Sequence, residues 1–283
     1  MEKLDISIIT PSYNMLPYLK CCAASIADQK GVCVDHIVID ANSIDGTQEW
    51  LAGQSKIRFI SELDNGMYDA INKGLKYAKG DILAYLNCDE QYLPGTLAFV
   101  MEYFVSHPDV DVLFGDFLVV NSDGSLVSYR KAFQPRWYYI QATHLYVFTC
   151  TMFMRRKLIE DGMSFDTTYR SIADSLFVID VLKKRYKVRH VKRYMSVFMM
   201  TGRNQLISDN SSKEIERMNS EHGYWCSKIL KHPLNLLRIT EKLLHGCYFE
   251  KYPLSYSIYT GDNIDKRKSF SILHGSPLWK LGN

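Results

Sequence analysis

Zinc-type cysteine spacing, long apolar runs and an excess of one charge are all missing from this chain of 283 residues. No CxxC pair or Cys/His spacing occurs and the cysteines number seven, so neither a zinc site nor a complete disulfide framework is indicated. We therefore expect reduced, mostly buried thiols, as in a cytoplasmic protein. The net charge of +3 is too small to favour a nucleic-acid partner.

The apolar runs are short, since none reaches the roughly 18 residues that mark a spanning helix. The first residues lack a basic region followed by an apolar one, so no signal peptide is predicted. Neither an internal repeat nor a low-complexity tract occurs. What the chain does have is 47% hydrophobic and 23% charged residues, the proportions of a soluble globular protein with an ample core.

The first 115 residues alternate between strand-like and helix-like patterns with short connections. Strands are expected at 5–10, 34–40, 57–60, 82–86 and 110–114, and helices at 18–29, 67–78 and 94–107. This alternation predicts an α/β fold whose mostly parallel sheet carries helices on both faces.

The pattern changes after Gly115. A hairpin at 117–120 and 126–130 contains an Asp-Gly turn and predicts a small antiparallel portion. A helix is expected at 173–184, with further strands at 188–191 and 194–200. Residues 206–283 mix apolar and basic residues and predict a mainly helical extension, with one helix beginning near Pro233 and ending near Gly246.

Polar segments follow three of the expected strands: TPSYN (10–14), VIDANSIDGT (38–47) and LNCDE (86–90). Because ligands of open α/β sheets sit at the carboxyl ends of strands, we expect these segments to share one site. The acidic cluster of the third segment is costly to place after a buried strand unless a cation meets it. Its oxygen ligands suit Mg²⁺ or Mn²⁺ shared with a phosphate, so the pattern indicates a metal-dependent site for a phosphorylated ligand.

Together with SELDNGMYDAINKG (61–74) and ADSLFVIDVLKK (173–184), these segments make the chain resemble the inverting glycosyltransferases of family 2, in a form common in bacterial polysaccharide assembly. The resemblance covers about residues 4–200. It implies a GT-A fold and a nucleotide-diphosphate sugar donor. Residues 1–205 would then form the catalytic domain, with 1–115 as the nucleotide-sugar half and 116–205 as the acceptor-side half.

The resemblance assigns the nucleoside pocket to the turns after the first two strands. Tyr13 would pack near the base, and Asp40 would accept a hydrogen bond from it, uracil in many members. Ser43 lies in the adjoining turn, where an Asx-type turn with a helix cap at Asp45 is the structural alternative. The residues that would line the pocket are Thr10, Pro11, Ser12 and Tyr13.

The helix after Gly66 would border the sugar nucleotide. Asp69, Asn72 and Lys73 share one face of it by their spacing, although a solvated face is the alternative. Asp89 matches the metal-binding carboxylate of the family's Asp-x-Asp motif, for a divalent cation that would neutralise the diphosphate leaving group. Asn87 stands where that motif has its first Asp, and a helix cap before Pro94 is the alternative.

Asp174 matches the family's general base, which would deprotonate the acceptor hydroxyl. A helix N-terminal acid favoured by the dipole is the structural alternative. Asp180 is its competitor on the same helix but points elsewhere by its spacing, and Asp166 is open to a structural role.

The acceptor side departs from the family. Thr149 and Cys150 stand where many relatives have a His-Gln pair, with His144 upstream, and residues 201–204 replace a Gly-Gly segment of the lid. Arg203 has two interpretations, a diphosphate contact or a surface arginine. The acceptor, a glycan or lipid-linked glycan, is therefore not specified.

A basic run at 183–193 contains no acid and precedes an apolar C-terminal region. Docking on the anionic inner face of a membrane is one interpretation, and a solvated face with a packed helix is the other. A sugar-nucleotide pyrophosphorylase is disfavoured, because TPSYN offers neither a glycine-rich loop nor a basic residue. A non-catalytic sugar-nucleotide-binding or scaffold module remains the alternative to a hexosyltransferase-type enzyme.

Overall fold

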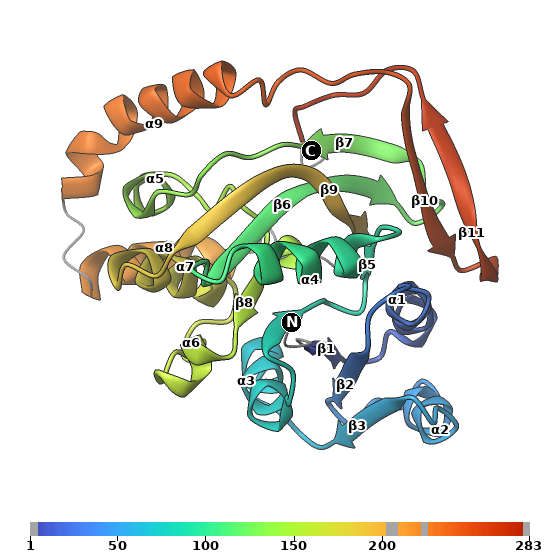
Figure 1. The fold of residues 1–283 in the computed structure, drawn as a ribbon. Helices are drawn as coiled ribbons and strands as arrows, with labels where there is room; N and C mark the ends of the chain where they lie inside the picture. The colour runs from blue at the N-terminus through green and yellow to red at the C-terminus, as the bar shows by residue number, and fades with distance from the viewer. Residues whose placement is uncertain (1–4, 202–208, 222–225, 280–283) are drawn as a thin grey trace.

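The computed structural model describes residues 5–201, 209–221 and 226–279. Within these residues nine strands form one sheet in the order β3-β2-β1-β4-β8-β6-β9-β5, with β7 paired to β6 (Figure 1). These strands are β1 (Ile6–Ser12), β2 (Val34–Asp40), β3 (Ile57–Ser61), β4 (Ile82–Tyr85), β5 (Glu90–Tyr92), β6 (Val112–Asn121), β7 (Leu126–Arg130), β8 (Phe153–Arg155) and β9 (Val188–Met200).

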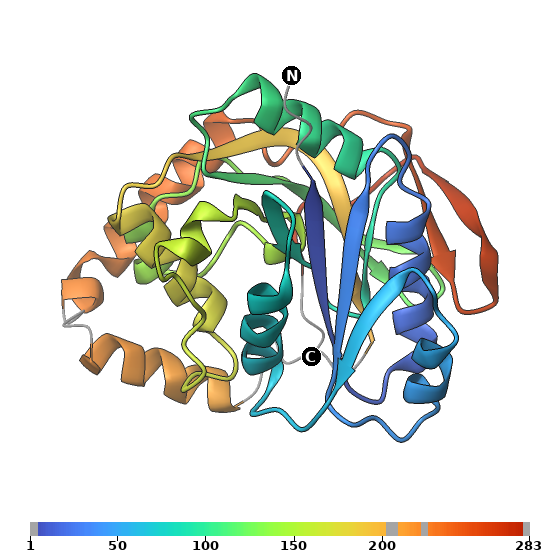
Figure 2. The same ribbon diagram turned by 60° about the horizontal axis from the view of Figure 1, so that its bottom comes forward.

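Strands β3, β2, β1 and β4 are parallel neighbours, and helices cover both of their faces (Figure 2). Side chains of β1 alternate between the two layers: Ile9 packs with α3, whereas Ile6 and Ile8 pack with α1 and α4. The expected mostly parallel α/β sheet with helices on both faces is thus confirmed. The helices of this half are α1 (Leu16–Ala27), α2 (Thr47–Ala52), α3 (Met67–Tyr77) and α4 (Thr96–Ser106).

Two glycines bring α3 close to the sheet. Gly66 has a φ of 106°, so the turn into α3 uses a conformation that other residues rarely adopt. Gly74 faces β1 so closely that an added Cβ would lie 2.4 Å from Cγ2 of Ile9. Any larger residue at Gly74 would therefore push α3 away from β1, and with it the polar side chains on the first turns of the helix.

The second half of the sheet is mixed. Strand β8 runs antiparallel between β4 and β6, the predicted hairpin β6–β7 forms, and β6 pairs parallel with β9. Strands β6 and β9 are each continuous where the sequence pattern suggested two pieces, and β5 was not predicted at all. Around these strands lie α5 (Trp137–Ala142), a 3₁₀ turn (Thr149–Thr151), α6 (Lys157–Glu160) and α7 (Ala173–Lys183).

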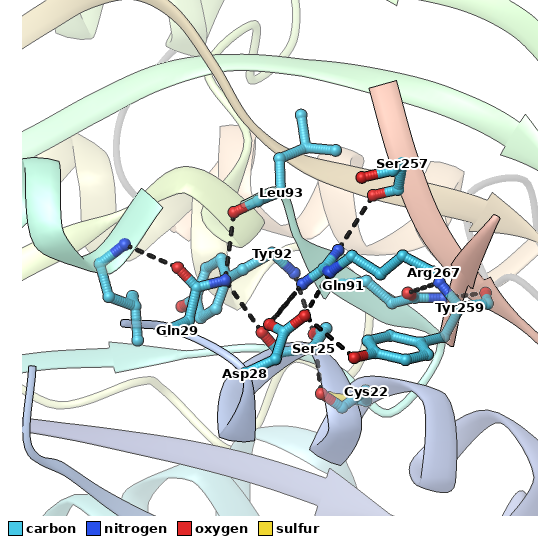
Figure 3. A network of polar contacts seen from close by, with 11 residues as sticks. Cys22, Ser25, Asp28, Gln29, Gln91, Tyr92, Leu93, Ser257, Tyr259 and Arg267 are labelled. Atoms are coloured by element: carbon cyan, nitrogen blue, oxygen red, sulfur yellow. Dashed lines mark hydrogen bonds and ion pairs between the residues drawn. The ribbon is translucent and has the colours of Figure 1, made fainter. Parts of the chain in front are cut away.

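The C-terminal extension contains α8 (Asp209–Glu221), α9 (Cys226–Leu244) and an antiparallel pair, β10 (Leu254–Thr260) and β11 (Asn263–Ile272). This hairpin was not predicted from the sequence, and Pro233 lies inside α9 instead of beginning it. The hairpin is joined to α1 and β5 (Figure 3). Arg267 pairs with Asp28 at 2.5 Å, and the side-chain amide of Gln91 bonds both backbone polar groups of Tyr259 at 2.8 Å.

The six cysteines whose side chains the structure describes are all free thiols. Five are buried and Cys33 is exposed, which confirms the expectation of reduced, mostly buried thiols for these six. Among the described residues, no helix has the length and apolar character needed to cross a bilayer.

Candidate active site

The turns after β1 and β2 are tied together by the carboxylate of Asp40. This side chain is fully buried at the end of β2 and accepts hydrogen bonds from the amide and hydroxyl of Ser43 and from the hydroxyl of Ser61. The Ser43 hydroxyl accepts in turn from the amide of Asn14 at 2.8 Å. Asp40 therefore fixes the shape of the sheet edge at which β1 and β2 end.

The residues predicted to line a nucleoside pocket differ in how deeply their side chains are buried. Thr10 is fully buried, and its hydroxyl lies 3.0 Å from Nε2 of His36, so its side chain supports the turn from beneath. Pro11 is also buried, whereas Tyr13 is 62% exposed and free to contact a ligand. The buried hydroxyl of Ser12 has no hydrogen-bond partner among the described residues.

Asp45 has the structural role that the sequence left open. One carboxylate oxygen accepts from the amide of Leu16 at 2.8 Å, and the other accepts from the amide and hydroxyl of Thr47. The side chain thus serves the first turns of both α1 and α2. These hydrogen bonds explain the position of the Asp45 side chain without any contact to a ligand.

On α3, Lys73 and Asp69 brace the loop that precedes the helix. Lys73 forms ion pairs with Glu62 at 2.9 Å and Asp69 at 3.3 Å, and Asp69 accepts from the amide of Asn65. Asn72 instead makes paired hydrogen bonds with the backbone of Phe165, at 2.8 and 2.9 Å. The side chain of Asn72 therefore anchors the segment that leads toward α7, away from the sheet edge.

The segment after β4 places three polar side chains in different surroundings. Asp89 is half-buried, whereas Glu90 is only 2% exposed and accepts from the amide of Asn87 at 2.9 Å. Burial raises the pKa of Glu90 well above its ordinary value, and the charges of Asp89 and Asp174 raise it further. Oδ1 of Asn87 is buried and has no partner among the described residues.

Asp174 is the second residue of α7 and is partly buried. Its Oδ1 accepts from the amide of Ser175 at 2.7 Å, and a hydrogen bond with Tyr68 holds it from α3. Burial raises the pKa of Asp174 to about 6, although these two hydrogen bonds oppose the shift. Asp180 is exposed on the same helix, and Asp166 accepts from Thr168 in a local turn, which is a structural role.

Asp89 and Asp174 both lie within electrostatic range of the buried Glu90, because the charge of each raises the pKa of Glu90. The ends of β2, β1 and β4 meet at the same edge, because Ser12 pairs with Asp40 and Ile9 with Tyr85. Asp174 from α7 and the acidic turn after β4 thus act electrostatically on the same buried side chain.

Sequence reasoning missed the supporting residues of this site. Tyr68 and Tyr85 both lie near Asp174, whose charge raises the pKa of each phenol after the larger effect of burial. No spacing signal marks them, because their contacts with α7 span about a hundred residues of sequence. Glu90 belongs to the acidic cluster of the LNCDE segment, but the structure buries it in the interior.

No group of three or more His, Cys, Asp or Glu side chains able to hold a metal occurs in the described parts of the chain. The residues would fit a different arrangement, in which Asp89 would supply one carboxylate and a bound diphosphate and water would supply the other ligands, as is common for Mg²⁺. The unpartnered Oδ1 of Asn87 is a second oxygen at this position.

The family model for "Glycosyl transferase family 2" matches residues 7–163, more than half of the chain. The chain belongs to this family. The predicted family is therefore confirmed.

Among curated relatives of this glycosyltransferase chain, the putative teichuronic acid biosynthesis glycosyltransferase TuaG of Bacillus subtilis is 24% identical over 236 residues, covering 78% of this chain and 92% of TuaG. A PGL/p-HBAD biosynthesis glycosyltransferase of Mycobacterium tuberculosis is 33% identical over 119 residues, which is 40% of this chain and 46% of the relative.

Solved structures share the fold. TarS 1-349 of S. aureus in complex with UDP-GlcNAc has a TM-score of 0.63 at 20% identity, covering 76% of this chain and 65% of that one. The mannosyltransferase PcManGT of Pyrobaculum calidifontis, with GDP-Man and Mn²⁺, has a TM-score of 0.52 at 18% identity, covering 71% and 57%. The GT-A fold expected from the sequence is confirmed.

Proposed function

We propose that this chain transfers a sugar, of the hexosyl type, from a nucleotide-diphosphate donor to a hydroxyl of a glycan or lipid-linked glycan, with inversion at the anomeric carbon. The observation that carries the proposal is that Asp89, from the turn after β4, and Asp174, from α7, both lie within electrostatic range of the buried Glu90. Membership of glycosyl transferase family 2 and likeness to TuaG support a role in bacterial polysaccharide biosynthesis in the cytoplasm.

The donor is a UDP-sugar in this proposal, because TarS was solved with UDP and with UDP-GlcNAc. The exposed ring of Tyr13 stacks on the base, and Ser12, Ser43 and Pro11 line the nucleoside from the turns that Asp40 holds. A carboxylate has about four acceptor sites, and the described residues donate three hydrogen bonds to Asp40, so in this proposal a base N–H would be the fourth donor. Asp69 and Lys73 border the donor from α3.

A divalent cation, Mn²⁺ or Mg²⁺, would be held by Asp89 and Asn87 together with the donor. When bound, it neutralises charge on the diphosphate leaving group. PcManGT, which was solved with Mn²⁺, supports this assignment. The single half-buried carboxylate suits a cation that arrives with the nucleotide, because a permanent site would need more protein ligands.

Asp174 is the general base of the proposed reaction. Its carboxylate takes the proton of the acceptor hydroxyl while that oxygen bonds to the anomeric carbon and the bond from that carbon to the diphosphate breaks. With a pKa raised to about 6 by burial, Asp174 is ionised at neutral pH yet more basic than an ordinary carboxylate. Tyr68 and Ser175 fix its direction by hydrogen bonds, which supplies the orientation that such a weak base needs.

In the proposed function the chain also contacts the inner face of the membrane through α9. Leu236, Leu237 and Leu244 are 66%, 56% and 81% exposed on this helix. The basic run contributes less than its sequence suggests, because Lys187 pairs with Asp109 at 2.5 Å and Lys183 lies over the Trp137 ring. An amphipathic helix of this kind lies in a membrane interface without crossing it.

Donor hydrolysis and sugar transfer with Mn²⁺ test the enzyme. Asp174→Asn is expected to lower kcat by about 10²–10⁴-fold, the range for losing a positioned base, while donor binding is kept. Asp180→Asn is the matched control, since it removes the same charge from an exposed position on the same helix and leaves kcat unchanged.

A panel of UDP-, GDP- and dTDP-sugars with and without Mn²⁺, read by thermal shift, identifies the donor. Asp89→Asn is expected to abolish the Mn²⁺-dependent part of the shift. A wild-type chain that binds a sugar nucleotide but turns nothing over would instead identify a non-catalytic binding or scaffold module. No shift with any nucleotide would contradict both functions.

A further inference from the structure

Helix α9 buries two of its basic side chains and exposes several of its leucines. Arg238 and Lys242, one turn apart, are only 8% and 9% exposed, whereas Leu237 and Leu244 are more than half exposed. A surface helix of a globular protein normally buries its apolar stripe and leaves its charges in water. The burial of both cations therefore needs its own explanation.

A third cation meets them from another element. This cation is Arg130, at the end of β7, and it lies within electrostatic range of both residues. The pKa of Lys242 shows the effect: burial lowers it most, and repulsion from Arg130 and Arg238 brings it to about 8. Burial and the charge of Arg238 lower the pKa of Arg130 in the same way. His144, after α5, faces the same three charges, which add to the effect of burial in lowering its pKa to about 4.

No acidic side chain among the described residues pairs with this basic cluster, defined as Arg130, Arg238 and Lys242. Arg130 donates to the carbonyl of Pro277 at 3.0 Å, Arg238 donates to Oδ1 of Asn235 at 2.8 Å, and the Lys242 ammonium lies 4.9 Å from the centre of the Tyr248 ring. These are neutral partners, so no charge within the described ranges compensates the three cations.

The acids nearest in sequence are engaged elsewhere. Glu241 pairs with Arg136 at 2.5 Å, and Glu250 pairs with Lys131 at 3.0 Å. Nε of Arg238 is buried and has no acceptor in the described part of the chain. This buried guanidinium has an unused donor and lies near two other cations. A bound anion would accept that hydrogen bond and compensate the three positive charges.

We infer that the basic cluster is a binding site for a phosphate or diphosphate group. A guanidinium presents N–H donors in a fork that matches phosphate oxygens, and a lysine ammonium adds a point charge. Three cations from two elements also match the charge of a phosphate better than that of a single carboxylate. The site is separate from the candidate active site, since it is built from β7 and α9, and it uses neither Asp89 nor a metal.

Isothermal titration calorimetry with inorganic phosphate and pyrophosphate, in EDTA, tests the site on the full chain. The wild type is expected to bind, and Arg238→Gln and Lys242→Gln are each expected to weaken binding by about 10- to 100-fold, the effect of losing one charge-assisted hydrogen bond. Lys242→Arg keeps the charge and should keep most of the affinity. Asp89→Asn should bind phosphate normally, which separates this result from any failure at the donor site.

The matched control is Lys30→Gln/Lys266→Gln, which removes two exposed positive charges elsewhere and should bind as the wild type does. Without ligand, Lys242→Gln should melt no lower than the wild type, because it relieves repulsion, and phosphate should raise its Tm less than it raises the Tm of the wild type. A wild type that binds neither anion in EDTA, or an Arg238→Gln/Lys242→Gln variant that binds like the wild type, would overturn the inference.

A second arm distinguishes a lipid headgroup from a free phosphate. Phosphatidylcholine vesicles with and without phosphatidic acid are sedimented with the wild type and with Arg238→Gln/Lys242→Gln. Loss of the phosphatidic acid-dependent fraction in the variant supports a lipid phosphate as the occupant. An unchanged fraction, together with lost binding of inorganic phosphate, supports a soluble phosphate.

Discussion

At the scale of single residues, Asp174 combines partial burial with directed hydrogen bonds. Burial raises its pKa to about 6, whereas the hydrogen bonds from Ser175 and Tyr68 lower the pKa and partly offset the effect of burial. A base works only in its deprotonated form, so its contribution is present above about pH 6 and is lost as the pH falls through that value. An unperturbed aspartate, with a pKa near 3.9, would stay active two units lower.

We therefore expect kcat at saturating donor to fall about tenfold for each pH unit below about 6, following the protonation of Asp174. A pH–rate profile of sugar transfer measures this limb. Asp180→Asn should reproduce the wild-type profile, because Asp180 is an exposed residue of the same helix and has no role in the proposed reaction. A limb centred near pH 4 would show that another group is the base or that Asp174 is better solvated than the structure indicates.

The sequence could name Asp174 because its spacing in ADSLFVIDVLKK is a family pattern, and the first-turn position of Asp174 follows from local helix propensity. It could not give Glu90 its buried position. That burial depends on β5 pairing with β9, whose Phe198 lies opposite Glu90 in the register. A contact made across more than a hundred residues leaves no periodic trace in the three residues Glu90–Tyr92.

At the scale of elements, the hairpin β10–β11 is held to α1 by one ion pair with several supporting bonds. The Arg267 guanidinium donates to both oxygens of Asp28, donates to the carbonyl of Ser257 and lies 4.9 Å from the centre of the Tyr259 ring (Figure 3). Tyr259 donates to the same carboxylate at 2.9 Å. Charge-assisted bonds with a mostly buried arginine are among the stronger ones in proteins.

We expect Arg267→Leu to lower the free energy of unfolding by about 1.5–3 kcal/mol, because it strips Asp28 of its cation and leaves the hairpin with fewer contacts. Urea denaturation measures the loss. In a double-mutant cycle, Asp28→Asn and Arg267→Leu should be less than additive, since the second change removes a partner that is already gone. Strict additivity would mean that the ion pair contributes nothing.

The elements of the first half were predictable because each has its own period and its own stop signal. Strand β2 has the predicted bounds, and α3 begins at the predicted Met67 after Gly66. The extension was less predictable for a physical reason. A proline such as Pro233 usually marks the start of a helix, but here it lies inside α9. The leucines that α9 exposes indicate that contacts with neighbouring elements, and not local preference, decide where this helix lies.

At the scale of the whole molecule, polar and apolar surfaces are unevenly distributed. Helices α1 to α4 cover the parallel half of the sheet and bury their apolar faces against it (Figure 2). Helix α9 lies on the outer edge of the other half, next to α5, and leaves its leucines in solvent (Figure 1). This exposed row lies on the half that carries Asp174, because α9 packs against α5 and α5 packs against α7.

We expect the double variant Leu237→Ser/Leu244→Ser to bind phospholipid vesicles at least tenfold more weakly than the wild type. Burying one leucine is worth about 1.5–3 kcal/mol, and two are lost together. Vesicle sedimentation across a range of lipid concentrations measures the change. Because both side chains are more than half exposed, the Tm should change little, which separates lost docking from lost folding. Leu273→Ser, at a 65% exposed leucine on the end of the hairpin, should bind vesicles like the wild type. If the α9 variant also bound like the wild type, the leucines of α9 would need a protein partner to account for their exposure.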